Sequence, residues 1–132
     1  MTRFVIDPQA LIDFLRADQP LAAGHLLVAP NAIRTQALEL LLCAVKDECV
    51  SEQDALALHE QMTALKMRLL GDRVSRRAAW NLAREHGWDD LRYAEYLAIT
   101  QLQADALVAG DHELARLASD IVALAPTSAL VC

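Results

Sequence analysis

Glycines and cysteines are scarce in this sequence, and their scarcity argues against two classes of protein. The chain has four glycines among 132 residues, and neither Gly71 nor Gly110 belongs to a phosphate-binding loop of the P-loop or dinucleotide type. The three cysteines, Cys43, Cys49 and Cys132, are an odd number without metal-ligand spacing. We therefore expect neither a nucleotide-cofactor enzyme nor a disulfide framework, and we expect the thiols to be buried or free.

Long apolar runs and an excess of positive charge are also missing. No apolar run approaches the length of a membrane span, and Phe4-Val5-Ile6 meets Asp7 too soon to form the core of a signal peptide. We therefore expect a cytoplasmic protein without a membrane segment. The net charge of -6 argues against a general nucleic-acid coat. A content of 55% apolar and 23% charged residues is ordinary for globular proteins and predicts one domain over residues 1–132.

One segment departs from this acidic balance. Residues 66–77, KMRLLGDRVSRR, hold five of the twelve basic residues, namely Lys66, Arg68, Arg73, Arg76 and Arg77. Such a cluster could follow a phosphate backbone, and Arg73, Arg76 and Arg77 are the candidate RNA-binding residues. The alternative is a solvated face around a helix–helix turn at Gly71-Asp72, and the sequence leaves both interpretations open.

Strand and helix signals alternate along the chain. Short apolar runs predict strands over residues 3–6, 26–28, 106–108 and 121–124. Capping residues and apolar periodicity predict helices after Asp7-Pro8, after Pro30-Asn31, from Ser51 through Leu69, from Val74 to Gly87, after Asp89 or Asp90, and after Asp111. Parallel strands need crossover connections, which helices usually supply. The sequence therefore predicts an α/β fold with a central parallel sheet of about four or five short strands flanked by helices.

Two aspartates come just after predicted strands. Asp7 follows Phe4-Val5-Ile6, and Asp111 follows residues 107–110. In an open parallel sheet the functional crevice lies outside the carboxyl ends of the strands, so the two carboxylates should approach each other there. Each aspartate could also be only a helix cap, and the pattern alone leaves capping and a shared site open.

Three blocks of the sequence resemble the PIN domains, and in particular the single-domain VapC-type ribonuclease toxins. RFVIDPQALIDFL is similar to that family's first strand and first acid, LVAPNAIRTQALELL to its second strand and helix, and YAEYLAITQLQADALVAGDHELA to its closing block. The closing block is the most specific of the three. The resemblance implies a PIN-like fold whose clustered acids hold Mg²⁺ or Mn²⁺ and cut RNA, because hard cations take oxygen ligands and activate water.

The resemblance places the family's acids on four positions of this chain. The first acid falls on Asp7 and the last on Asp111, and both match. The acid of the second helix falls on Gln36, and the remaining acid falls on Tyr93. The amide oxygen of Gln36 could still ligate an ion, but a tyrosine hydroxyl is neutral near pH 7 and cannot offset a divalent charge. The implied metal site is therefore weakened.

Three further acids lie about one helical turn from the altered positions and could line the site, namely Glu39, Asp89 and Asp90. A shift of one turn moves a carboxylate by ~5 Å, which is longer than a coordination bond. These acids could therefore replace the missing ligands only in part.

The resemblance implies a Mg²⁺- or Mn²⁺-dependent endoribonuclease, the toxin of a toxin–antitoxin pair. Asp7 and Asp111 would be catalytic and hold the ion, Gln36 would support it, and Tyr93 would line the site. The implied partners are RNA and an antitoxin protein, and the expected assembly is a homodimer. The alternative is a catalytically impaired PIN-like module that binds RNA or a protein. We expect Trp80 and Trp88 to be packing anchors rather than base-stacking platforms.

Overall fold

The computed structural model describes residues 1–131, which contain one sheet of four parallel strands in the order β3-β2-β1-β4. The strands are β1 (Thr2–Ile6), β2 (His25–Pro30), β3 (Arg68–Leu70) and β4 (Ala106–Val108). All three neighbouring pairs are parallel, and β1 and β2 lie at the centre of the sheet. The prediction of an α/β fold with a parallel sheet is confirmed.

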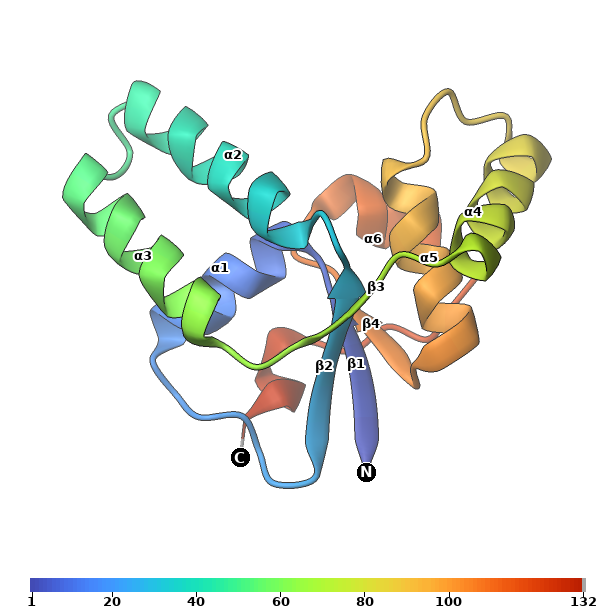
Figure 1. Cartoon of the computed structure of the whole chain (residues 1–132), viewed down its shortest axis with the longest axis horizontal. Coiled ribbons are helices and arrows are strands. Elements are labelled where there is room, and N and C mark those ends of the chain that lie inside the picture. Colours follow the sequence, from blue (N-terminus) through green and yellow to red (C-terminus); the bar gives the residue numbers. More distant parts are fainter. Residues whose placement is uncertain (132) are drawn as a thin grey trace.

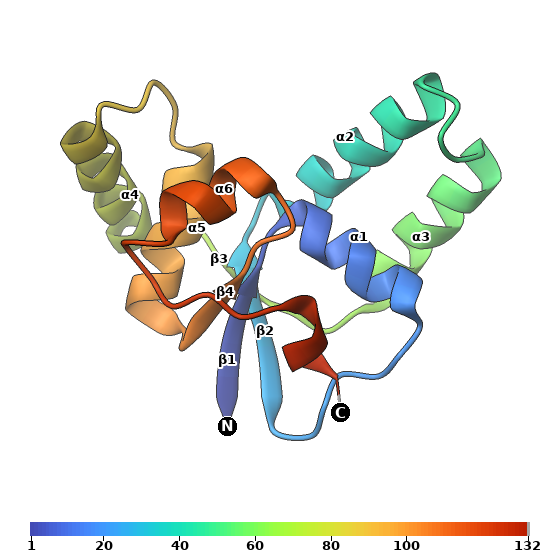
Figure 2. The same ribbon diagram turned by 180° about the vertical axis from the view of Figure 1, so that it is seen from behind.

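Six α-helices and one short 3₁₀ helix accompany this sheet in residues 1–131. They are α1 (Pro8–Ala17), α2 (Ile33–Lys46), α3 (Glu52–Ala64), α4 (Arg73–His86), α5 (Arg92–Gln103), α6 (His112–Ala118) and η1 (Thr127–Leu130). Figures 1 and 2 show two groups of helices, with α1, α2 and α3 on one side of the strands and α4, α5 and α6 on the other. The two groups diverge beyond the carboxyl ends of β1 and β2.

Short polar side chains fix the starts of four helices. Asp7, Ser51, Asp72 and Asp111 each precede a helix, and each side chain accepts a hydrogen bond from a backbone N–H of the first turn. An oxygen at this position pairs a donor that the helix itself leaves without a partner. α4 ends at Gly87, whose φ of 71° suits glycine. The helix starts expected at Asp7, Ser51 and Asp111 and the helix end expected at Gly87 are confirmed.

Two predicted elements are wrong. The helix predicted from Ser51 through Leu69 ends at Ala64, and residues 68–70 form the edge strand β3 instead. β3 pairs with the end of β2, so Gly71-Asp72 joins a strand to a helix rather than two helices. The strand predicted over residues 121–124 is reduced, within the described range, to a single parallel bridge between Leu124 and Leu107. Both outcomes depend on pairing across the sheet, which local periodicity does not report.

The central strands and α5 form the middle of the core. Val5, Leu27 and Leu107 are fully buried, and α5 packs against β1, β2 and β4. Trp80, in contrast, is 54% exposed, so the packing role expected for it is wrong. Trp88 does pack against the core as a partly buried residue.

Three smaller points complete the comparison with the sequence. In the described residues no helix has both the length and the apolar character needed to cross a membrane. Cys43 and Cys49 are free thiols, as expected, and both are exposed. Cys132 lies outside the described residues.

Candidate functional site

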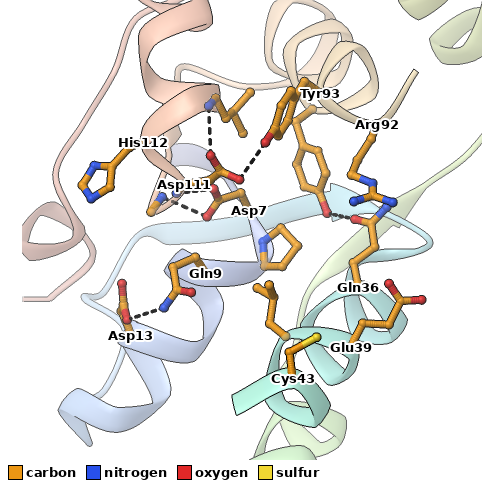
Figure 3. Close-up of a pocket in the computed structure, with 15 residues that line it drawn as sticks. Asp7, Gln9, Asp13, Gln36, Glu39, Cys43, Arg92, Tyr93, Asp111 and His112 are labelled. Carbon is orange, nitrogen blue, oxygen red and sulfur yellow. Dashed lines mark hydrogen bonds between the residues drawn. The ribbon is translucent and has the colours of Figure 1, made fainter. Parts of the chain in front are cut away.

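A cleft of about 690 Å³ lies at the carboxyl ends of β1 and β4. Its walls come from α1 and α2 on one side and from α5 and α6 on the other. Five of the residues expected at the site line this cleft and are shown in Figure 3, namely Asp7, Gln36, Glu39, Tyr93 and Asp111. The strand-end location is the one that parallel α/β sheets generally use for ligands.

Asp7 lies at the floor of the cleft with 0% of its surface exposed. Its Oδ1 accepts hydrogen bonds from the backbone N–H groups of Ala10 at 2.7 Å and Gly110 at 2.9 Å, and its Oδ2 accepts one from Asp111 at 2.8 Å. One carboxylate thus caps α1 and joins the exits of the adjacent parallel strands β1 and β4. The predicted approach of Asp7 and Asp111 is confirmed.

Asp111 is also engaged on both of its oxygens. Its Oδ1 accepts from the backbone N–H groups of Glu113 at 2.8 Å and Leu114 at 3.2 Å, which caps α6. Its Oδ2 accepts a hydrogen bond of 2.9 Å from the hydroxyl of Tyr93. The capping role and the place in the cleft, which the sequence left as alternatives, therefore occur together.

A second tyrosine holds the remaining site position. The hydroxyl of Tyr96 donates to Oε1 of Gln36 at 2.6 Å, joining α5 to α2 across the floor of the cleft (Figure 3). Tyr96 is 1% exposed. The amide oxygen that could ligate an ion thus already accepts one hydrogen bond and keeps one lone pair, and the NH₂ of Gln36 can also face a ligand.

Burial governs the titration of the groups in the cleft. Burial raises the pKa of Asp7, the three backbone N–H groups lower it, and the nearby charge of Asp111 raises it further, with a net increase over the ordinary value. Burial and the hydrogen bond to Asp111 raise the pKa of Tyr93 to about 12. Burial also raises the pKa of Tyr96. Both tyrosines are therefore neutral hydrogen-bond donors at physiological pH.

Sequence reasoning missed Tyr96 and Arg92, which also line the cleft. Tyr96 lies three residues after Tyr93, and this spacing puts both rings on one face of α5, so helical periodicity could have found it. Arg92 lies one residue before Tyr93, and its charge is opposite to that of Glu39, which lines the same wall as Gln36. No pattern in the sequence indicated that its side chain would reach this cleft.

Two of the expected site residues lie elsewhere. Asp89 and Asp90 line a separate hollow of about 280 Å³, which Tyr93 also borders. Oδ1 of Asp90 accepts a hydrogen bond of 3.1 Å from the backbone N–H of Arg92, at the start of α5. The N-cap of α5 is Leu91, without a side-chain cap, so the prediction that Asp89 or Asp90 caps this helix is wrong, and Asp90 contacts the helix start only through this one bond.

The donor atoms of the cleft fit a catalytic Mg²⁺ or Mn²⁺ centre poorly. Both oxygens of Asp7 and both oxygens of Asp111 already accept hydrogen bonds, and Asp7 is closed to solvent. The oxygen of Gln36 is bonded to Tyr96. Among residues 1–131, no group of three or more His, Cys, Asp or Glu side chains is arranged to hold a metal ion. One lone pair remains on Oδ2 of Asp111 and one on Oε1 of Gln36, so an ion would gain at most two oxygens from these residues without displacing a hydrogen bond.

The fold and the cleft define an α/β domain with two aspartates joined at the ends of the adjacent strands β1 and β4. No family model matches the chain, and no curated protein matches it. The resemblance to PIN domains rests on the three sequence blocks, and the positions of Asp7 and Asp111 are consistent with it.

Proposed function

We propose that this chain is a cytoplasmic, catalytically impaired PIN-like domain that binds RNA without cutting it efficiently. The observation that carries the proposal is the pair of tyrosine hydrogen bonds. Tyr93 occupies an oxygen of Asp111, and Tyr96 occupies the oxygen of Gln36. Two of the oxygens that a PIN nuclease would use for its ion therefore each accept a hydrogen bond within the protein, which leaves fewer lone pairs for an ion.

The electrostatics support the same conclusion. Metal-assisted phosphodiester hydrolysis needs an ion that activates water and stabilises charge on the phosphate, and carboxylates must hold that ion. Where the resemblance implies four acids, this chain has two carboxylates and two neutral groups, Gln36 and Tyr93. The hydroxyl of Tyr93 donates a hydrogen bond to Asp111, an arrangement that stabilises a cleft without a cation.

RNA is the partner that the charges favour. α4 contains four arginines and a single acidic residue, Glu85, although the chain as a whole has a net charge of -6. A concentrated basic segment on an acidic protein attracts a polyanion to one place. Arg73, Arg76 and Arg77, the arginines singled out from the sequence, all belong to this helix.

A second candidate is the Mg²⁺- or Mn²⁺-dependent endoribonuclease, the toxin implied by the resemblance. The observation that favours it is the contact between Asp7 and Asp111 at the strand ends, because Mg²⁺ is usually held by one or two carboxylates with water and phosphate completing its shell. On this candidate the ion would take the remaining lone pair of Asp111 Oδ2, or Tyr93 would release that oxygen. The chain's own residues would then orient the RNA through Arg92 and the NH₂ of Gln36, both of which line the cleft.

The proposed protein partners, an antitoxin or a second copy in a homodimer, have one supporting observation. Leu42 and Leu56, on α2 and α3, are 61% and 53% exposed and line an apolar groove of about 320 Å³. Exposed apolar surface of this kind is common at protein–protein contacts.

Cleavage of a labelled single-stranded RNA pool, with Mg²⁺, with Mn²⁺ and with EDTA, separates the two candidate functions. The impaired module should bind the RNA and cut it no faster with metal than with EDTA. The double variant Gln36→Glu with Tyr93→Asp should gain metal-dependent cleavage, and adding Asp111→Asn to it should remove the gain. Metal-dependent cleavage by the wild type that Asp111→Asn abolishes would establish the nuclease instead.

A further inference from the structure

The outer face of α4 carries a straight line of basic and aromatic side chains. Arg73, Arg77, Trp80 and Arg84 are all exposed, and their spacing of four, three and four residues aligns them along the helix. We call these four residues the α4 ridge. The buried side chains of α4, which include Ala79 and Leu82, lie on the opposite face of the helix.

The α4 ridge is separate from the cleft. α4 packs mainly against α5, and Figure 1 shows it on the outer side of its group of helices, with α5 between it and the strands. None of the four ridge residues lines the cleft of about 690 Å³. A ligand on the ridge would therefore not need to enter the cleft.

Arg76, which the sequence grouped with Arg73 and Arg77, does not belong to the ridge. Its guanidinium donates to the backbone carbonyl of Gly71. It also lies near Glu95, a carboxyl whose pKa burial raises and the charge of Arg76 lowers. Arg76 is exposed like the ridge arginines, but its charge is already directed to groups of the protein.

The chemistry of the ridge matches a single-stranded nucleic acid. Arg84 lies eleven residues after Arg73 along the helix, a rise of roughly 16 Å, which covers a few nucleotides. Guanidinium groups bind phosphates, and an exposed indole offers a flat surface on which a base can stack. Trp80, at 54% exposure, is the only indole in α4 and lies between Arg77 and Arg84.

A membrane surface is a poorer match for the same residues. An interfacial helix presents a broad apolar face of several large side chains. In α4 the large exposed apolar residues are Trp80 and Val74, and Val74 lies beside the ridge rather than on it. Phosphate attraction combined with one stacking ring is therefore the better description.

We infer that the α4 ridge binds single-stranded RNA, with the arginines on successive phosphates and Trp80 stacked on a base. The inference rests on the proposed RNA-binding function and adds the place of binding, which is the outer face of α4 and not the strand-end cleft.

Fluorescence anisotropy of a labelled mixed-sequence RNA oligonucleotide, measured at several salt concentrations, tests the ridge. Arg77→Gln with Arg84→Gln should weaken binding by about tenfold or more, and should reduce the slope of log affinity against log salt by ~1.4, as expected for two lost phosphate contacts on a single strand. The matched control is Arg3→Gln with Arg16→Gln, which removes the same charge from two other exposed positions. This control should change both quantities much less.

Substitutions of Trp80 test the stacking contact. Trp80→Ala should weaken binding by about five- to a hundredfold, with little change in the salt slope, because stacking is not a phosphate contact. Trp80→Tyr should restore most of the affinity. Light scattering and binding to phosphatidylserine vesicles are measured on the same variants.

Equal losses in the ridge and control doubles would overturn the inference, since net charge alone would then explain RNA binding. If Arg92→Gln lost RNA binding while Arg77→Gln with Arg84→Gln kept it, the RNA would lie in the cleft. That result would overturn the inference but not the proposed function. A wild type without RNA affinity would overturn both. A dimer that Trp80→Ala dissociates, or vesicle binding that depends on Trp80 without RNA binding, would also overturn the ridge as an RNA site.

Discussion

Replacing Asp7 with serine tests whether this carboxylate stabilises the fold by joining α1 to the residues that follow β4. Serine keeps one oxygen that can accept from Ala10 and cap α1, but it is too short to reach the N–H groups of Gly110 and Asp111, which the carboxylate pairs at 2.9 Å and 2.8 Å. Each buried donor left without a partner costs ~1–3 kcal/mol. The loss of buried negative charge and the entry of water offset a part of this cost. We therefore expect Asp7→Ser to lower the free energy of unfolding by ~2–4 kcal/mol.

Urea unfolding in the presence of EDTA measures this loss. Asp7→Ala also removes the cap and should unfold with a further loss of ~0.5–2 kcal/mol, giving the order wild type, serine, alanine. The control is Asp13→Ser, an exposed acid in the same cleft that bonds only the side chain of Gln9, and it should stay within ~0.5 kcal/mol of wild type. A carboxylate that served only to bind metal would destabilise the metal-free protein. If Asp7→Ser were as stable as the wild type in EDTA, or more stable, the stabilising role of Asp7 would be refuted.

Two other predictions concern the same cleft. The hydroxyl groups of both tyrosines donate hydrogen bonds to neighbouring side chains, so an ultraviolet titration should show no tyrosine ionising near the ordinary pKa of ~10, with Tyr93 ionising at about 12. The tyrosines of the unfolded chain lose their protons at lower pH than those of the folded protein, so the free energy of unfolding should fall as the pH rises through this range. Tyr93→Phe should reduce that fall. Ionisation of both tyrosines near pH ~10 in the folded protein would contradict the hydrogen bonds. Gly110→Ala should lose ~1–3 kcal/mol in urea unfolding, because its Cβ would lie 2.7 Å from the backbone nitrogen of Ala10; an unchanged midpoint would contradict the close approach of the β4 exit to α1.

The sequence predicted the elements whose signals are local and strong. Asp7-Pro8 and Ser51 gave correct helix starts because capping is settled within one turn of the chain. Leu65, Met67 and Leu69 were ambiguous, since they continue the spacing of α3 and also alternate as a strand does. Residues 68–70 form a strand rather than a helix because they pair with the edge of β2. That contact joins distant parts of the sequence and leaves no trace in a short window.

The candidate site was predicted in position but not in its bonding. Strand-end logic brought Asp7 and Asp111 together, and the family resemblance drew attention to Gln36 and Tyr93. The hydrogen bond between Tyr96 and Gln36 joins residues 60 positions apart, and only the packing of α5 near α2 creates it. The ridge could have been predicted, because its members fall opposite the small residues of α4 on a helical wheel. Assigning Trp80 a packing role in advance hid that pattern.

Calorimetric titration with Mn²⁺ tests the central claim, that tyrosine hydrogen bonds have replaced the metal site. The wild type should show no saturable binding up to millimolar Mn²⁺, because Asp111 Oδ2 and Gln36 Oε1 each already accept a hydrogen bond and neither Gln36 nor Tyr93 adds a negative charge to hold the ion. Gln36→Glu with Tyr93→Asp should bind Mn²⁺, and should be less stable in EDTA than with the ion, because unneutralised carboxylates would then crowd one cleft. Micromolar binding by the wild type that Asp111→Asn abolishes would contradict the account.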